Sequence, residues 1–178
     1  MSPDRRIRRT QQALTGALVE LMLEKGFDTL TVAEIADRAD VGRSTFYAHY
    51  ADKEDLLQGS LSNLREWLRA AIEQGVDAKA SHPALRFCRP MAEHVGDNRK
   101  LHALFAGGRG SGMVQELMRE MWADFIREGW PGADPLAVHA VAGAFEATVT
   151  WWLGTAPELS AEQVVLRFEA LMTPALSR

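Results

Sequence analysis

Apolar residues recur along the chain at the spacing of amphipathic helices, and this pattern predicts an all-helical protein. In the first expected helix, at about residues 5–25, Leu14, Leu18 and Leu21 fall on one side and Gly26 ends the helix. Beyond the first fifty residues, helices are expected at about 53–75, 83–95, 99–105, 113–128, 135–153 and 161–172. Asp134 before Pro135, and Ser160 three residues before Gln163, are typical starts for the last two.

Residues 31–57 contain two shorter helical segments separated by a tight break. Thr31 and Glu34 have the spacing of a capping box, which predicts a helix from residue 32. The break is Asp40-Val41-Gly42, where Gly42 is expected to take a backbone conformation that other residues resist. A second helix follows at about 43–50, and Asp52 is the expected N-cap of the long helix after it.

The second of these segments has distinct inner and outer sides. Phe46 and Tyr50 lie one turn apart and are expected to face the core. The outward residues are Arg43, Ser44, Tyr47, Ala48 and His49. Two short helices joined in this way indicate a helix-turn-helix, which serves mainly to place one helix in the DNA major groove.

The same segment resembles the DNA-binding region of the tetracycline-repressor (TetR) family. The matching residues are Thr31-Val32-x-x-Ile35-Ala36, Val41-Gly42-x-Ser44-Thr45-Phe46-Tyr47-x-His49-Tyr50 and Asp52-Lys53-Glu54-x-Leu56-Leu57. The resemblance covers roughly the first third of the chain. It departs from the family at Asp40, where members often carry Gly, and at Gly42, where they often carry Ser or Thr.

The resemblance implies two domains: a three-helix DNA-binding head at residues 1–51, and a helical effector-binding and dimerisation domain at 52–178. It makes 43–50 the recognition helix, in which Arg43 is the candidate for reading guanine O6 and N7 together. Thr31 and Lys53 match positions at helix N-termini that hold phosphates. The full set of expected DNA contacts is Thr31, Arg43, Ser44, Thr45, Tyr47, Ala48, His49 and Lys53. The plainer alternatives are a packed aromatic at Tyr47 and a surface histidine at His49.

An effector pocket between the long helices of the larger domain is also implied by the resemblance. The candidates are mostly aromatic residues, methionines and histidines: Trp67, Phe87, Met91, His94, His102, Phe105, Met118, Trp122, Phe125 and Trp151. Such residues at helical spacing are often ordinary core, so this alternative stays open. A pocket built from them would suit an aromatic or hydrophobic ligand.

The last two expected helices are more apolar than a single buried face requires, which indicates a partner chain. TetR-like proteins dimerise by pairing these helices with those of a second subunit. The expected interface residues are Ala140, Gly143, Ala147, Val164, Phe168 and Leu171.

The composition adds limits on the class of protein. The net charge is −4, yet Arg5, Arg6, Arg8 and Arg9 crowd the N-terminus, where they are either a phosphate-binding patch or a solvated tail. The lone Cys88 cannot form an internal disulfide, and with no signal peptide or membrane-spanning stretch visible, a soluble cytoplasmic protein is expected.

Three kinds of chemistry are not expected. The glycine-rich stretch 106–112 lacks the strand and the Lys-Ser/Thr ending of a phosphate-binding loop, so it is interpreted as a connection between helices. His94 and His102 lack the helical His or carboxylate partner of a metal site, and no cofactor is expected. An enzyme is the least favoured class, because no nucleophile and base occur at a usable spacing.

The sequence thus predicts a homodimeric repressor that a small-molecule effector releases from a palindromic DNA operator. The alternative is a DNA-binding regulator with no small-molecule effector.

Overall fold

The computed structural model describes residues 3–75, 79–106 and 112–176, and this part of the chain contains helices and turns but no strand. The elements are α1 (Pro3–Lys25), α2 (Val32–Arg38), α3 (Arg43–Tyr47), α4 (Lys53–Glu73), the 3-10 helix η1 (Pro83–Leu85), α5 (Cys88–Asp97), α6 (Arg99–Ala106), α7 (Gly112–Gly129), α8 (Pro135–Thr155) and α9 (Ala161–Leu176). The expected all-α fold class is therefore confirmed.

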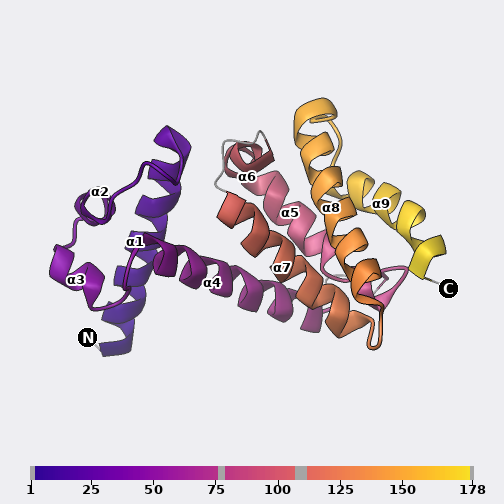
Figure 1. Cartoon of the computed structure of the whole chain (residues 1–178), viewed down its shortest axis with the longest axis horizontal. Helices are drawn as coiled ribbons and strands as arrows, with labels where there is room; N and C mark the ends of the chain where they lie inside the picture. Colours follow the sequence, from indigo (N-terminus) through magenta and orange to yellow (C-terminus); the bar gives the residue numbers. More distant parts are fainter. Residues whose placement is uncertain (1–2, 76–78, 107–111, 177–178) are drawn as a thin grey trace.

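The helices form two groups that α4 connects (Figure 1). Helices α1, α2 and α3 gather around the N-terminal end, and α4 runs from them beneath the second group, which comprises α5 to α9. Within the second group, α7 packs on α8 and on η1, while α5 packs on α9. The N-terminal group is not held by α4 alone, because α1 also contacts α6.

The caps expected from the sequence are present. The Thr31 hydroxyl accepts a hydrogen bond from the Glu34 N–H, and the Glu34 carboxylate accepts one from the Thr31 N–H at 3.0 Å. Asp52 accepts from the Asp55 N–H at 2.8 Å, and Ser160 accepts from the Gln163 N–H at 3.2 Å. These bonds satisfy N–H groups that the first turn of a helix leaves open, and they place the starts of α2, α4 and α9.

Two expected boundaries were wrong. Helix α3 ends at Tyr47 instead of residue 50, because the chain turns there to enter the extended Asp52 cap of α4. The helix expected at 83–95 is instead η1 followed by α5, which begins at Cys88. A single helix would place Pro90 in its interior, whereas in α5 Pro90 falls in the first turn, where its missing N–H costs little. Of the glycine-rich stretch, residues 107–111 lie outside the described part.

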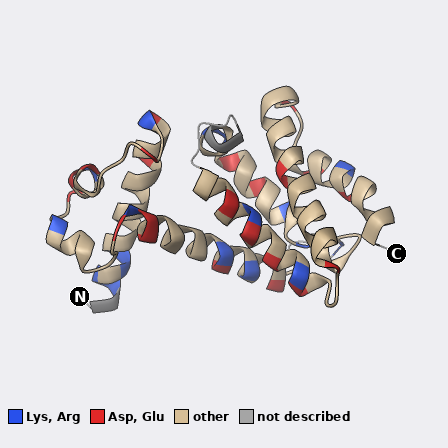
Figure 2. Ribbon diagram, viewed as in Figure 1, with Lys and Arg blue, Asp and Glu red and all other residues tan. Residues whose placement is uncertain are grey.

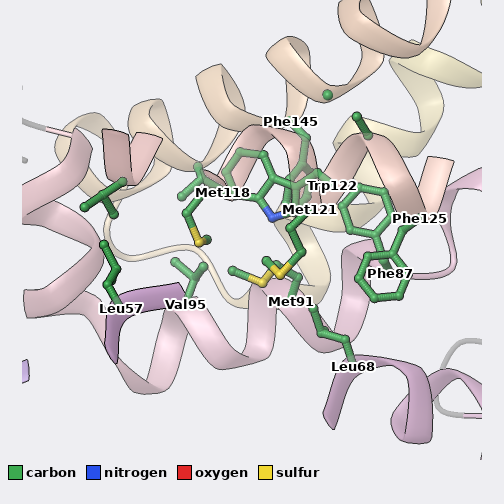
Figure 3. Close-up of a cluster of buried hydrophobic side chains, with 14 of the residues drawn as sticks. Leu57, Leu68, Phe87, Met91, Val95, Met118, Met121, Trp122, Phe125 and Phe145 are labelled. Carbon is green, nitrogen blue, oxygen red and sulfur yellow. The ribbon is translucent and has the colours of Figure 1, made fainter. Parts of the chain in front are cut away.

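A continuous aromatic and methionine core lies between α4, α5, α7 and α8 (Figure 3). Phe145 lies at its centre: its ring meets Phe87 edge-on with centroids 5.0 Å apart, and Trp122 at 5.3 Å. Phe87 in turn stacks on Phe125 at 6.0 Å. Edge-on and offset pairs of this kind add to the stabilisation from burial and fix the relative placement of the helices.

Helix α8 is longer and more apolar than expected. Its 21 residues include one charged side chain, Glu146, and by length and mean hydropathy the helix passes for a membrane span. The expectation that no segment is long and apolar enough to span a membrane was therefore wrong. The same test is passed by core helices of soluble proteins, and one face of α8, with Phe145 and Trp152, is buried in the helical group.

Candidate nucleic-acid interface and effector cavities

Helix α3 is fixed from beneath by aromatic packing. Phe46 is fully buried, and Tyr50 packs beside it with ring centroids 6.0 Å apart. Tyr47 meets the edge of Phe46 at 5.5 Å but is itself 59% exposed. Because α3 has one turn and a half, these contacts, and not its own hydrogen bonds, hold its outer face in position.

The break between α2 and α3 depends on Asp40 and not on Gly42. Asp40 has a positive φ of 54°, in the left-handed region, and the following Val41 N–H bonds back to the Ala36 carbonyl at 3.0 Å. Gly42 has an ordinary extended backbone with φ −69°, so the conformation expected for it was wrong. Asp tolerates the left-handed region better than most residues, which explains how a position often held by Gly in TetR-like proteins is filled here.

The predicted recognition residues form one continuous outer surface. Arg43, Ser44, Tyr47 and Ala48 are exposed, whereas Thr45 and His49 are half-buried. A shallow groove of about 540 Å³ runs beside them. It is lined by Arg6, Ile7 and Thr10 of α1 and by Asp40, Val41, Gly42, Ser44, Thr45, Ala48 and His49. The N-terminal turns of α1 thus share a surface with α3, and Figure 2 marks Lys or Arg positions on both helices.

Thr31 and Lys53 have roles within the chain itself. Thr31 caps α2, as described above. The Lys53 ammonium donates to the carbonyls of Phe27 and Asp28 at 3.1 and 3.0 Å, and it lies 4.8 Å from the centre of the Phe27 ring. Lys53 therefore links the start of α4 to the turn that follows α1. Whether either residue also contacts phosphate stays a prediction.

Ion pairs brace α2 against α1. Arg38 donates two hydrogen bonds to Glu24, both at 2.8 Å, and a third at 3.3 Å to Glu20. Lys25 pairs with Glu34, the capping-box carboxylate. Hydrogen bonds from Lys25, and then from the Thr31 side chain and backbone, lower the pKa of Glu34 from 4.5 to about 2.

Two of the cavities in the C-terminal group are lined by predicted pocket residues, four of the ten in all. The first, of about 180 Å³ between α7 and α8, is lined by His102, Gln115, Met118, Trp122, Glu146, Val149 and Thr150. The second, of about 210 Å³, extends toward α1 and is lined by Thr15, Leu18, Val19, Met22, Leu57, Ser60, Leu61, Leu64, His94, Asn98, Leu101, His102, Val114 and Met118. His102 and Met118 line both, and His94 and Trp122 line one each.

The other predicted pocket residues lie elsewhere. Phe87, Met91 and Phe125 are buried in the aromatic core and line neither cavity. Trp67 and Trp151 are exposed, by 47% and 41% respectively. The side chain of Phe105 is outside the described part of the structure. The plainer alternative, ordinary core, therefore holds for Phe87, Met91 and Phe125.

Sequence reasoning missed the polar lining residues Gln115, Glu146 and Thr150, and the whole contribution of α1. Glu146 had a usable signal, because it is the single charged residue in the long apolar segment 135–155. A charge there needs a partner, and Arg119 supplies one by donating from Nε to the Glu146 carboxylate at 2.9 Å. The lining from α1 had no such signal, since Leu18 and Met22 follow the pattern of ordinary core.

The two cavity histidines are held in the neutral form. Burial, and then the neighbouring His94, lowers the pKa of His102 to about 3, and burial lowers the pKa of His94. Their rings meet edge-on at 5.4 Å. No group of three or more potential metal ligands occurs among the described residues.

Helices α8 and α9 together expose an apolar surface with a shallow groove of about 340 Å³. The groove is lined by Ala147, Thr148, Trp151, Val164, Arg167, Phe168 and Leu171. Of the predicted dimer residues, Ala140, Ala147 and Leu171 are exposed and Gly143 is half-buried. Val164 and Phe168 are buried within the chain and form the floor of the groove.

A helix-turn-helix joined by a long helix to a larger helical group is the architecture of a DNA-binding regulator with a second functional domain. Comparison with known proteins agrees. Residues 14–59 match the family of bacterial regulatory proteins of the tetR type. The N-terminal part of the chain therefore matches the DNA-binding region of TetR-type regulators.

The relatives match this chain mainly in its N-terminal part. The HTH-type transcriptional regulator TcmR of Streptomyces glaucescens is 36% identical over 69 residues, which are 39% of this chain and 30% of TcmR. Across the curated relatives that it matches, the chain spans between 15% and 35% of their length.

The solved structures extend the likeness in fold to almost the whole chain. A TetR transcriptional regulator from Streptococcus agalactiae has a TM-score of 0.69 and 24% identity, covering 94% of this chain and 96% of that one. FadR from Bacillus subtilis, solved in complex with stearoyl-CoA, has a TM-score of 0.62 and 19% identity, covering 91% and 97%. At these identities the likeness establishes the fold alone.

Proposed function

We propose that this chain is a sequence-specific transcriptional repressor that binds a near-palindromic DNA operator as a homodimer and leaves it when a small-molecule effector binds. The observation that carries the DNA-binding part is the outer face of α3. There Arg43, Ser44 and Tyr47 are exposed beside the N-terminal turns of α1, on a rigid aromatic base. The relatives are named as regulators, and no enzyme family is indicated.

On this proposal the residues of α3 divide the work of recognition. The exposed Arg43 guanidinium reads a guanine in the major groove, a contact worth about 1–3 kcal/mol of discrimination. Ser44 and the Ala48 methyl allow close approach to base edges. Thr45, Tyr47 and His49, together with Arg6 on α1, hold the phosphate backbone on either side.

Dimerisation is assigned to α8 and α9. Leu136 and Leu171 are 74% and 70% exposed, which is unusual for leucines in well-packed helices, and Leu166 and Trp151 are exposed as well. A two-fold dimer through these helices would place two copies of α3 in successive major grooves, about 34–36 Å or a multiple of that apart. On this proposal, residues 1–51 bind DNA, and residues 52–178 hold the effector and form the dimer contacts. The protein acts in the cytoplasm.

Effector control is supported by where the second cavity lies. Its lining comes from α1 in the DNA-binding group and from α4, α5, α6 and α7 in the C-terminal group. A ligand there changes how the two groups pack, and so changes the separation of the two recognition helices. The coupling is reciprocal: DNA weakens effector binding by the same factor as effector weakens DNA binding.

The test is selection of bound duplexes from a random DNA pool at two salt concentrations. The expected result is an enriched inverted repeat whose affinity falls steeply with salt, since phosphate contacts release counterions. Arg43→Ala is expected to weaken binding and relax one base position, while Arg86→Ala, an exposed arginine outside α1–α3, leaves binding unchanged. Equal affinity of both variants would overturn the assignment of α3 as the recognition helix. Enrichment of an operator whose binding no effector changes would support the alternative, a regulator with no effector.

A further inference from the structure

The two cavities of the C-terminal group adjoin, because His102 and Met118 line both. The first is more polar and lies against α8, whereas the second is mostly apolar and reaches α1 and α4. Either one, at about 180 or 210 Å³, is smaller than the roughly 300–1,000 Å³ usual for small-molecule sites. Taken together they fall within that range.

Trp122, which lines the first cavity, carries a hydrogen-bond donor with nothing to donate to among the described residues. Trp122 is only 5% exposed, and its indole Nε1–H has no acceptor among the residues that the structure describes. In Figure 3 this nitrogen lies on the edge of the ring that faces the methionine side chains, among them Met118. A buried donor left without a partner is costly, and buried Trp N–H groups usually find one. A ligand oxygen that reaches this nitrogen from the cavity would supply the missing acceptor.

The charges around the cavities disfavour an anionic ligand. Among the residues that the structure describes, neither lining contains Lys or Arg, and His94 and His102 stay neutral at pH 7 because burial lowers the pKa of each. The one charged lining residue is Glu146, which Arg119 already engages from both Nε and Nη2 at 2.9 Å. A ligand carboxylate would therefore meet a like charge and no free cation of the lining.

The second, mostly apolar cavity lies between the DNA-binding group and the C-terminal group. Leu18 and Met22 of α1 and Leu61 and Leu64 of α4 all line it. Between the same two helices, the hydroxyls of Thr15 and Ser60 form a hydrogen bond at 3.1 Å. An apolar group inserted here presses directly on α1.

We propose that the two cavities form one site for a neutral, largely apolar molecule with a single hydrogen-bond acceptor. The acceptor binds Trp122 Nε1, and the apolar end lies between α1 and α4. The inference rests on the proposed function, since its consequence is the release of the operator.

The ligand class is tested by isothermal titration calorimetry of the full chain with four probes of one skeleton. These are valerophenone, pentylbenzene, 5-phenylpentanoate and 5-phenylpentylamine, which carry a neutral acceptor, no polar group, a negative charge and a positive charge. We expect valerophenone to bind tightest and the carboxylate to bind weakest. Tighter binding by either charged probe, or no binding by any of the four, overturns the proposal.

The role of the indole N–H is tested with Trp122→Phe, which keeps an aromatic ring and removes the donor. The variant is expected to lose roughly tenfold in affinity for valerophenone, and much less for pentylbenzene. The matched control is Trp130→Phe, at a half-buried tryptophan that lines neither cavity. An equal loss for both probes would show that the ring matters and the N–H does not, which overturns the assignment of the acceptor.

The second half of the site is tested by chain length. Acetophenone carries the same ketone without the butyl chain, so at saturating occupancy it should leave the operator bound, while valerophenone releases it. Release by both ketones would overturn the role of the space between α1 and α4. Calorimetry needs no DNA, so a failure of the ligand ranking remains distinguishable from a failure of DNA binding, which the duplex selection reports separately.

Discussion

Asp40 has a backbone conformation that is uncommon for a residue with a side chain. Its φ of 54° is the one positive value at a non-glycine position in the described residues. A side chain in this region meets the following carbonyl, a cost that Gly avoids, although Gly also gains freedom in the unfolded chain. The tight break between α2 and α3 is therefore formed at a modest cost in stability.

The first prediction follows from this cost. Asp40→Gly is expected to stabilise the folded state by about 0.5 kcal/mol, and to raise the melting temperature by roughly 1–2 °C. Asp37→Gly, the same change inside α2, should instead lose about 0.3 kcal/mol, because Gly is a still poorer helix former than Asp. Asp40→Asn keeps a side chain that tolerates the left-handed region and should leave stability unchanged. A lower melting temperature for Asp40→Gly than for the parent would contradict this account.

The second prediction concerns the charge of Glu34. Because Lys25 and Thr31 lower its pKa from 4.5 to about 2, the ionised form stabilises the fold above pH 4.5, and this contribution is lost as the pH falls toward 2. Glu34→Gln keeps the acceptor for the Thr31 N–H and removes the charge. We expect its melting temperature to lie below that of the parent at pH 7 and to converge with it between pH 4.5 and 2. Glu66→Gln, at an exposed carboxylate on α4, is the control; a constant gap for Glu34→Gln would exclude this explanation.

At the scale of elements, the end of α7 is placed by an unusually close backbone contact. A Cβ on Gly129 would lie 2.5 Å from the carbonyl carbon and oxygen of Pro83, and 2.6 Å from the Ala84 Cα. These are backbone atoms of η1, which cannot move aside as a flexible side chain does. The absence of a side chain at Gly129 thus lets α7 and η1 pack directly against each other.

Gly129→Ala is therefore expected to destabilise the protein by about 1–3 kcal/mol, because either α7 or η1 must shift. Gly16→Ala, in α1, meets nothing within 4 Å and should stabilise by about 0.5–1 kcal/mol. Urea unfolding followed by circular dichroism measures both. Similar effects of the two substitutions would show that the contact between α7 and η1 relaxes without cost.

The sequence predicts elements where a local signal is strong, and fails where the outcome depends on packing. The capping boxes of α2 and α9 and the Asp52 cap of α4 could be predicted because cap and partner lie within three residues. The end of α3 could not, because it depends on how the chain enters α4. Phe87 and Trp122 follow the same apolar spacing, yet only Trp122 lines a cavity, since that difference arises from the packing of α7 against α8.

At the scale of the whole molecule, charge is distributed unequally (Figure 2). Charged residues occur along α4 and α7, whereas α8 carries only Glu146. The face of α8 and α9 that turns away from the core also holds the exposed leucines. If the protein binds a palindromic operator, as proposed above, an apolar surface of this kind fits contact with a second copy, since an isologous interface has the two-fold symmetry of such an operator.

The last prediction tests this interface. Leu171→Glu places a charge beside the groove between α8 and α9, where a partner subunit would have to bury it without a counter-ion. We expect sedimentation to show a monomer and circular dichroism to show an unchanged helical content. Operator affinity should fall, because a monomer binds only one half-site. Leu23→Glu makes the same change at an exposed leucine on α1 and should stay dimeric. A Leu171→Glu variant that sediments as the parent does would place the dimer contact, and with it the spacing of the two recognition helices, on another face.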